Sequence, residues 1–178
     1  MAKILIADDN NGLRDVLVES LASLGHAVTG AADGSQAKSA LMADDFDLLL
    51  TDLRMPGLDG VALLEELAAA ERSVATIVMT AHGSVETAVK AMHLGALDYV
   101  EKPFPLTAME AKVEKALERL KTEQENRRLK DELQQRFGSL IGGSPPMQRV
   151  FELIGKVSQT ATPVLILGES GTGKELAA

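Results

Sequence analysis

Short apolar runs alternate with longer amphipathic segments along residues 1–105. The runs are short and nearly continuous, which is typical of strands buried on both faces of a sheet. In the segments between them, apolar residues recur every three or four positions, which is typical of helices. This alternation predicts an α/β fold, a doubly wound sheet of five parallel strands. The predicted strands are Lys3–Ala7, Ala27–Ala31, Phe46–Thr51, Val74–Thr80 and Ala96–Val100.

Two of the helices between these strands carry start and stop signals. The first has Asn10 or Asn11 as its N-cap and Gly25 as its stop. The second runs from a Ser84 cap to Gly95. The apolar stripe of the first helix consists of Leu13, Val16, Leu17, Leu21 and Leu24.

Residues 106–138 have a different pattern, with many charged side chains and no Gly or Pro before Gly138. They predict one long helix that continues the last helix of the sheet domain. A lone helix would expose its apolar stripe to water, so we expect it to pair as a short coiled coil. The stripe slips in register, which leaves a solvated linker helix as the alternative. The stripe residues are Leu106, Met109, Val113, Ala116, Leu120, Leu129 and Leu133.

A loop at Gly138–Pro146 separates this helix from the last part of the chain. A helix is predicted at Met147–Gln159, followed by a buried strand at Pro163–Gly168. The sequence therefore predicts three parts. They are a sheet domain (1–121), a long helix that continues its last helix (106–138), and the beginning of a second domain (139–178).

Composition narrows the class of protein. The chain has no cysteine, which excludes disulfides and cysteine metal sites and permits a reducing compartment. Residues 1–105 carry 16 acidic and 7 basic side chains, so this domain should repel nucleic acid. No apolar run approaches the roughly 20 residues that span a bilayer, and no signal peptide is evident. We expect a cytoplasmic protein without a membrane segment.

Four charged residues follow predicted strands: Asp8, Asp9, Asp52 and Lys102. The carboxyl ends of parallel strands share one edge of the sheet, so these side chains can meet there. A single aspartate at a strand end is usually a turn former, but three carboxylates together favour a divalent cation. Ligands that are all oxygen select Mg²⁺ or Mn²⁺ over zinc. One carboxylate could then act as a nucleophile toward a phosphoryl group, with Lys102 paired to the phosphoryl oxygens.

Residues 1–121 closely resemble the receiver domain of bacterial two-component response regulators. The matching segments are Ile4–Asp9, Leu50–Gly60, Met79–Ala81 and Asp98–Phe104. The resemblance implies that Asp52 accepts a phosphoryl group from a sensor histidine kinase. It implies Mg²⁺ bound by Asp8, Asp9, Asp52 and the main-chain carbonyl of Arg54.

The resemblance also assigns the switch and the peptide geometry. Thr80 is implied as the switch hydroxyl, Tyr99 as the aromatic side chain that follows it, and Lys102 as a phosphate ligand. The Lys102–Pro103 peptide is expected to be cis. His82 lies two residues beyond Thr80, and we interpret it as a solvent-facing loop residue.

A second motif lies near the end of the chain and has the form of a phosphate-binding loop, in which backbone N–H groups surround phosphates. With Ile141–Gln148 and the strand before it, this loop resembles the start of the AAA+ domain of NtrC-type sigma-54-dependent transcription activators. ATP is expected only in the full-length parent, since the chain lacks the rest of that domain. The loop residues are Gly168, Glu169, Ser170, Gly171, Thr172, Gly173, Lys174 and Glu175.

The favoured hypothesis is a signalling switch rather than an enzyme. Phosphorylation of Asp52 would reshape a face that carries Val85, Met92, Tyr99 and Met109, and would alter a homodimer formed by this face and the linker helix. Sigma-54 RNA polymerase and DNA would be contacted only through regions absent from this chain. An AAA+ ATPase with an accessory receiver is the alternative. A flavodoxin-like module is disfavoured because Asp8 and Asp9 would repel a flavin phosphate.

Overall fold

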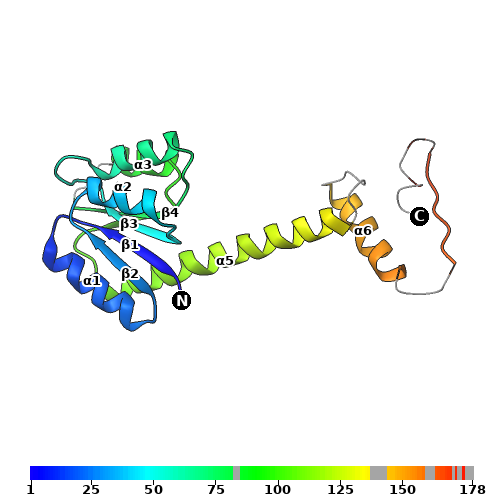
Figure 1. Ribbon diagram of the computed structural model, residues 1–178, viewed down its shortest axis with the longest axis horizontal. Helices are drawn as coiled ribbons and strands as arrows, with labels where there is room; N and C mark the ends of the chain where they lie inside the picture. Colours follow the sequence, from blue (N-terminus) through cyan, green and yellow to red (C-terminus); the bar gives the residue numbers. More distant parts are fainter. Residues whose placement is uncertain (82–84, 137–143, 159–162, 170, 172–173, 175–178) are drawn as a thin grey trace. The chain divides into compact units, whose positions relative to one another are not determined.

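The computed structural model describes residues 1–81, 85–136, 144–158, 163–169, 171 and 174 (Figure 1). The chain divides into two compact units, Met1–Lys121 and Thr122–Ala178. Within the described parts of the chain, no helix combines the length and the hydropathy needed to cross a membrane.

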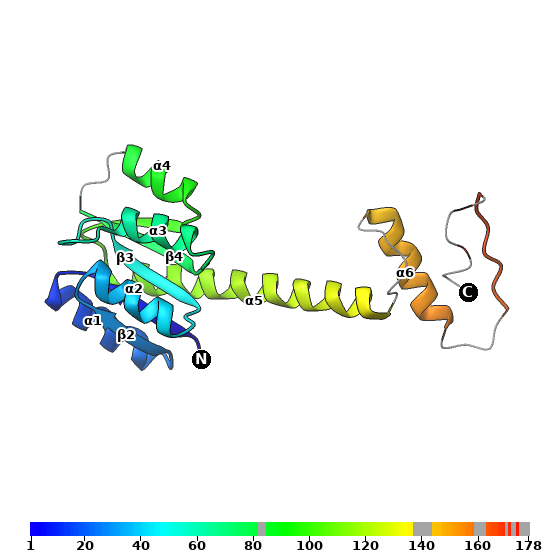
Figure 2. The same cartoon turned by 45° about the horizontal axis from the view of Figure 1, so that its top comes forward.

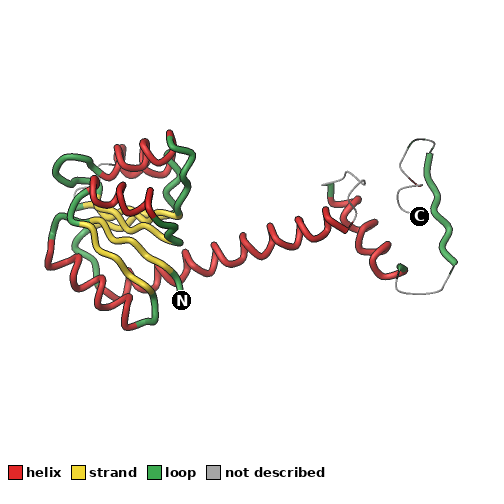
Figure 3. Tube along the Cα trace, viewed as in Figure 1, coloured by secondary structure: helices red, strands yellow, loops and turns green. Residues whose placement is uncertain are grey.

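The first unit is built on a sheet of five parallel strands in the order β2-β1-β3-β4-β5, which confirms the predicted fold class (Figure 3). The chain leaves β1 toward β2 on one side and reaches β3 on the other. The strand order therefore reverses next to β1 and β3, where α/β proteins place ligands beyond the carboxyl ends of the strands. The strands are β1 (Lys3–Ala7), β2 (Ala27–Ala31), β3 (Leu48–Asp52), β4 (Ala75–Thr80) and β5 (Asp98–Glu101).

Helices cover both faces of this sheet because alternate strand residues point to opposite sides. Leu5 and Leu49 pack in a cluster with residues of α2, α3 and α4, and Ile6 and Leu50 pack in a second cluster with residues of α1 and α5. Within the first layer, α4 lies beside α3 (Figure 2). The helices are α1 (Asn11–Ser23), α2 (Gly34–Ala43), α3 (Gly60–Ala69), α4 (Val85–His93) and α5 (Leu106–Arg136).

The helix signals of α1 are confirmed. The Asn10 side chain accepts a hydrogen bond from the Leu13 N–H as the N-cap. Gly25 follows the helix at φ 88°, a left-handed conformation that favours glycine. The stripe is narrower than expected, because Val16 remains 49% exposed. The predicted Ser84 cap of α4 lies outside the described residues.

The bounds of the last strand were predicted wrongly. The strand begins at Asp98 rather than Ala96, because the backbone around Ala96 closes α4. The Ala96 N–H donates to the carbonyl of Ala91, and Gly95 has φ 95°. These features belong to a helix C-cap, so Ala96 has no free N–H for the sheet. The start of the third strand also moves by two residues, from Phe46 to Leu48, and that of the fourth strand by one, from Val74 to Ala75.

The long helix α5 is present, but its apolar stripe is divided. Met109, Val113 and Ala116 are buried against the sheet of their own unit. Leu129 is 46% exposed, and the side chain of Leu133 lies outside the described part. The expectation that the whole stripe is available for a coiled coil is therefore wrong. The first half of the stripe is buried against the sheet, so only the later part of α5 can pair with a partner.

The second unit contains α6 (Pro145–Val157), close to the helix predicted there, with Phe151 buried. The strand predicted at Pro163–Gly168 is wrong, since residues 163–169 have no regular secondary structure. A strand needs a neighbour to satisfy its N–H and C=O groups, and no other segment in the described part of this unit is a strand. Four apolar side chains there are consequently exposed: Val164, Leu165, Ile166 and Leu167.

Gly60, the first residue of α3, lies against the strand end that carries Asp52. A Cβ added at Gly60 would lie 2.2 Å from the Asp52 carbonyl oxygen. We therefore expect Gly60→Ala to lower the free energy of unfolding by about 1–3 kcal/mol, measured by urea titration. Gly12→Ala is the control, because its Cβ would meet only the Asn10 Oδ1 at 3.5 Å and alanine favours a helix. Equal unfolding midpoints for the two variants would contradict this prediction.

Candidate functional site

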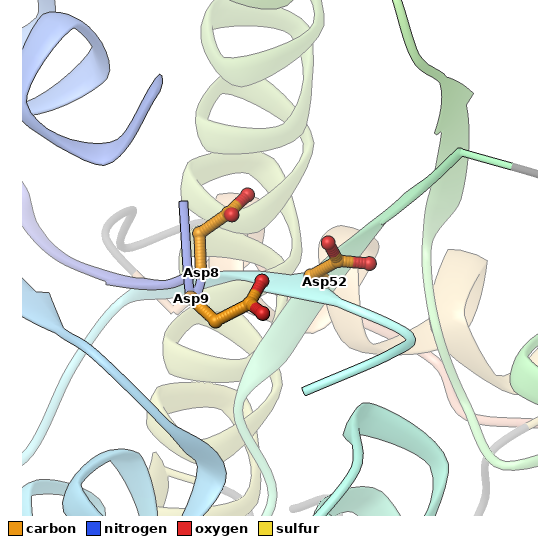
Figure 4. A group of neighbouring side chains, drawn as sticks. All are labelled: Asp8, Asp9 and Asp52. Carbon is orange, nitrogen blue, oxygen red and sulfur yellow. The ribbon is translucent and has the colours of Figure 1, made fainter. Parts of the chain in front are cut away.

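Three carboxylates meet at the carboxyl edge of the sheet, as the sequence predicts. Asp8 and Asp9 directly follow β1, and Asp52 ends β3 (Figure 4). One carboxylate oxygen from each of the three side chains lies within 4.8 Å of the other two. Asp8 and Asp52 are buried, whereas Asp9 is exposed and can face a ligand that enters from solvent. Such a set of hard oxygen donors suits Mg²⁺ and leaves positions for water or phosphoryl oxygens.

Lys102 completes this cluster from the end of β5. Its Nζ lies 2.6 Å from Asp8 Oδ2 and 2.6 Å from Asp52 Oδ2. The Lys102 backbone N–H donates to the carbonyl of Thr80 at 2.7 Å, which holds the segment after β5 against the end of β4. The Lys102–Pro103 peptide is cis, as predicted. One ammonium group thus bridges the two buried carboxylates.

The protonation of Lys102 follows from this bridge. Burial disfavours the charged ammonium, but the hydrogen bonds to Asp52 and Asp8 outweigh it. The pKa of Lys102 is therefore raised above its ordinary value of 10.5. A raised pKa means that the stabilising contribution is complete below pH 10.5 and is lost only as the pH rises through the higher value. Lys102 is accordingly a cation at neutral pH.

Backbone N–H groups orient the two buried carboxylates in the same way. Asn10 N donates to Asp8 Oδ1 at 3.0 Å, and Arg54 N donates to Asp52 Oδ1 at 3.1 Å. The second oxygen of each carboxylate accepts from Lys102. Each side chain is thus held by a turn within its own segment and by one shared lysine. The Arg54 carbonyl remains only a predicted metal ligand.

Two further predicted residues lie on neighbouring strands. Thr80 ends β4 and is buried at 3% exposure, and its own carbonyl accepts the hydrogen bond from the Lys102 N–H. Tyr99 lies in β5 and is 47% exposed. In the ladder, Tyr99 is paired with Val78 and Thr80 with Glu101. The switch roles of Thr80 and Tyr99 stay predictions, and His82 lies outside the described residues.

The prediction of the face that changes shape is wrong at one of its four residues, Met109. Val89, Met92 and Tyr99 are 44–47% exposed on α4 and β5. Met109 does not belong to this face, because it is fully buried between α5 and the sheet. The side chain of Val85 lies outside the described part of the chain.

Sequence reasoning missed one residue beside the carboxylates. Arg14, on α1, donates from Nη1 to the backbone carbonyl of Asp8 at 2.7 Å. A surface arginine on an amphipathic helix gives no signal of such a role in the sequence. The packing of α1 against the sheet brings it there.

The glycine-rich loop is described only in part. Lys174 Nζ donates to the carbonyls of Gly168 and Glu169, at 2.9 and 2.5 Å. The lysine thus folds back onto the start of its own loop, and Gly171 has φ 83°. The remaining predicted loop residues, Ser170, Thr172, Gly173 and Glu175, lie outside the described part.

Comparison with known proteins settles the family of the chain. A family model of the response regulator receiver domain matches residues 4–114. The chain belongs to this family. A second model, the sigma-54 interaction domain, matches residues 140–178, which contain the glycine-rich loop of this receiver protein.

Curated relatives of the receiver protein match along nearly its whole length. The DNA-binding transcriptional regulator NtrC of Salmonella typhimurium is 40% identical over 175 residues, which cover 98% of this chain and 37% of that protein. The C4-dicarboxylate transport transcriptional regulatory protein DctD of Pseudomonas aeruginosa is 40% identical over 179 residues, covering 99% of this chain and 39% of that protein. The chain therefore spans well under half the length of these relatives.

Solved structures are similar to this chain, one over nearly its whole length and one over its receiver part. NtrX from Brucella abortus, crystallised in complex with ATP, superposes with a TM-score of 0.69 at 33% identity, over 99% of this chain and 39% of that chain. The receiver domain of a Francisella response regulator superposes with a TM-score of 0.64 at 28% identity, over 67% of this chain and 98% of that chain.

Proposed function

We propose that this receiver accepts a phosphoryl group on Asp52 from a sensor histidine kinase and thereby controls a sigma-54-dependent transcription activator in the cytoplasm. The observation that carries this proposal is the cluster at the carboxyl edge of the sheet. There, Asp52 lies with Asp8 and Asp9 within 4.8 Å, and Lys102 bridges Asp52 and Asp8. Family membership supports the same reaction.

Each residue of this cluster would have a different role in the phosphoryl transfer. An Asp52 carboxylate oxygen would attack the phosphorus, the phosphorus–nitrogen bond to the kinase histidine would break, and an acyl phosphate would form. Mg²⁺ held by Asp8, Asp9, Asp52 and the Arg54 carbonyl would neutralise the carboxylates and bind phosphoryl oxygens. Lys102 is already 2.6 Å from Asp52 Oδ2, so its ammonium would pair with the added phosphoryl group.

Transmission of the signal would begin at the buried end of β4. The Thr80 hydroxyl would turn toward the new phosphoryl group, and the Tyr99 ring would follow. Tyr99, Val89 and Met92 form a half-exposed apolar face that a second copy could cover. We propose a homodimer through this face and the part of α5 beyond the sheet.

The C-terminal part of the chain would belong to the controlled ATPase. We propose that the whole protein binds ATP phosphates at Gly168–Lys174 and reaches sigma-54 RNA polymerase and DNA through regions outside this chain. The match of residues 140–178 to the sigma-54 interaction domain supports this assignment. In this proposal the receiver is the switch and the ATPase is its output.

Multi-angle light scattering with and without beryllofluoride and Mg²⁺ tests the proposal, because beryllofluoride mimics the acyl phosphate. We expect the mass to move toward that of a dimer when beryllofluoride is added. Asp52→Asn should show no change, and Met92→Asp should weaken the response because it places a charge on the apolar face. A mass that is independent of beryllofluoride, or an equal response from Asp52→Asn, would contradict the proposal.

A further inference from the structure

We infer that Arg14 is a positioning residue for the metal-binding segment, holding the backbone of Asp8 so that the Asp8 and Asp9 carboxylates are presented together. This inference rests on the proposed Mg²⁺-dependent function and concerns a residue outside the predicted site. Arg14 lies in the first turns of α1 and is partly buried.

The hydrogen bonds of Arg14 converge on the segment that carries the carboxylates. Nη1 donates to the Asp8 carbonyl at 2.7 Å, and Nη2 donates to the Asn11 Oδ1 at 2.8 Å. The Asp8 N–H meanwhile donates to the carbonyl of Ala31 on β2 at 3.1 Å. Both backbone polar groups of Asp8 are therefore held by neighbouring elements. The planar fork of a guanidinium fixes the directions of two such bonds from two separate nitrogens, which the single nitrogen of a lysine cannot do.

Gly30 gives Arg14 its path to the Asp8 carbonyl. A Cβ added at Gly30 would lie 3.2 Å from Arg14 Cδ and 3.4 Å from both Cγ and Nε. The Arg14 side chain thus passes directly over the place where a larger residue of β2 would stand. The lack of a side chain at Gly30 thus leaves the space that the Arg14 side chain occupies.

The position of this positive charge also differs from that of Lys102. Lys102 binds carboxylate oxygens that a metal ion would need, so it competes with the ion. Arg14 binds a main-chain carbonyl and so leaves the carboxylate oxygens free of its own hydrogen bonds. Its charge alone would oppose a cation, so its benefit to metal binding would come from holding the Asp8 backbone and not from charge.

The test compares Mg²⁺ affinity among variants by isothermal titration calorimetry. We expect Arg14→Ala to raise the Mg²⁺ dissociation constant about tenfold, as loss of a group that orients metal ligands typically does. Arg14→Lys should give a dissociation constant between those of the wild type and Arg14→Ala, because lysine can keep a hydrogen bond to the Asp8 carbonyl but lacks the guanidinium fork. Arg72→Ala is the matched control. Like Arg14, Arg72 donates to one side-chain oxygen and one main-chain carbonyl, here Asp45 Oδ1 and the Met42 carbonyl, but neither of these partners belongs to the carboxylate cluster.

Gly30→Val provides a second test that keeps the arginine. The valine should displace the Arg14 side chain and raise the Mg²⁺ dissociation constant when Arg14 is present. In a protein that already carries Arg14→Ala, it should have no further effect. Valine is favourable in a strand, so β2 should persist. In the metal-free protein, both variants should also speed hydrogen exchange of the Asn10 N–H, which donates to Asp8 Oδ1.

The outcomes separate the inference from the proposed function. Absence of Mg²⁺ binding by the wild type would overturn the metal site itself. Wild-type binding with unchanged affinity in Arg14→Ala and Gly30→Val would overturn only the role of Arg14. A lowered unfolding midpoint with unchanged affinity and unchanged Asn10 exchange would reduce Arg14 to a structural residue. If Arg14→Ala fails to fold, Gly30→Val decides between these outcomes.

Discussion

Asp52→Asn should accept no phosphoryl group from acetyl phosphate and Mg²⁺ under conditions in which the wild type accepts one. The amide has nearly the size of the carboxylate and can keep the hydrogen bond from Arg54 N to the Oδ1 position. It lacks the negative charge that makes the oxygen a nucleophile and a metal ligand. Intact-mass spectrometry of both proteins after equal incubation measures the result.

Asp33→Asn is the matched control for this experiment. Asp33 is half-buried and caps α2 by accepting a hydrogen bond from Gln36 N, and asparagine is an equally good cap. The control should therefore fold normally and be phosphorylated as the wild type is. Phosphorylation of Asp52→Asn to the wild-type extent would show that another residue is the acceptor.

Lys102→Met should destabilise the metal-free protein by about 3 kcal/mol at pH 7, because removal of one partner leaves buried charges uncompensated. The side chains of Asp8 and Asp52 are only 0% and 10% exposed, so water can solvate them little. Neutral pH lies well below the raised pKa of Lys102, so the wild-type contribution is complete there. Urea unfolding in the presence of EDTA measures the difference.

Mg²⁺ should reverse much of this loss. In the wild type the ion must compete with the Lys102 ammonium for the two carboxylates, whereas in the variant it meets no competitor. Mg²⁺ binds only the folded site and so stabilises it in proportion to its affinity. Its addition should therefore stabilise Lys102→Met more than the wild type.

Lys112→Met controls for the loss of any lysine ion pair. Lys112 pairs with Asp98, and the two side chains are 34% and 42% exposed. A partly solvated pair of this kind is worth at most about 1 kcal/mol. If the two variants lose equal stability, or if Mg²⁺ stabilises Lys102→Met no more than the wild type, the bridging role of Lys102 is wrong.

The hydrophobic pattern of the sequence predicted the strands well where burial or strand pairing alone decides the local structure. The first two strands have the bounds expected from sequence. The apolar run of β1 packs between two helical layers, and β2 pairs with β1 along its whole length at the edge of the sheet. The sequence patterns failed at Ala96, where an apolar residue suits a strand but its N–H forms the hydrogen bond that closes α4. They failed again at Val164–Leu167, where an apolar run has no neighbouring strand among the described residues. A local helix-closing hydrogen bond to Ala91 decided the first case, and the lack of a partner strand among the described residues decided the second.

The sequence by itself determined the strand–helix alternation, and with it that Asp8, Asp9, Asp52 and Lys102 follow strands of one parallel sheet. Parallel strands share a carboxyl edge, so that order alone brings these four together. Only the tertiary structure decided that Lys102 bridges Asp8 and Asp52, that Met109 is buried, and that Arg14 crosses Gly30 to the Asp8 carbonyl. These features depend on the path of one side chain past an element distant in sequence. Periodicity assigns a residue to a face of its helix or strand, but packing between elements decides which atoms it contacts.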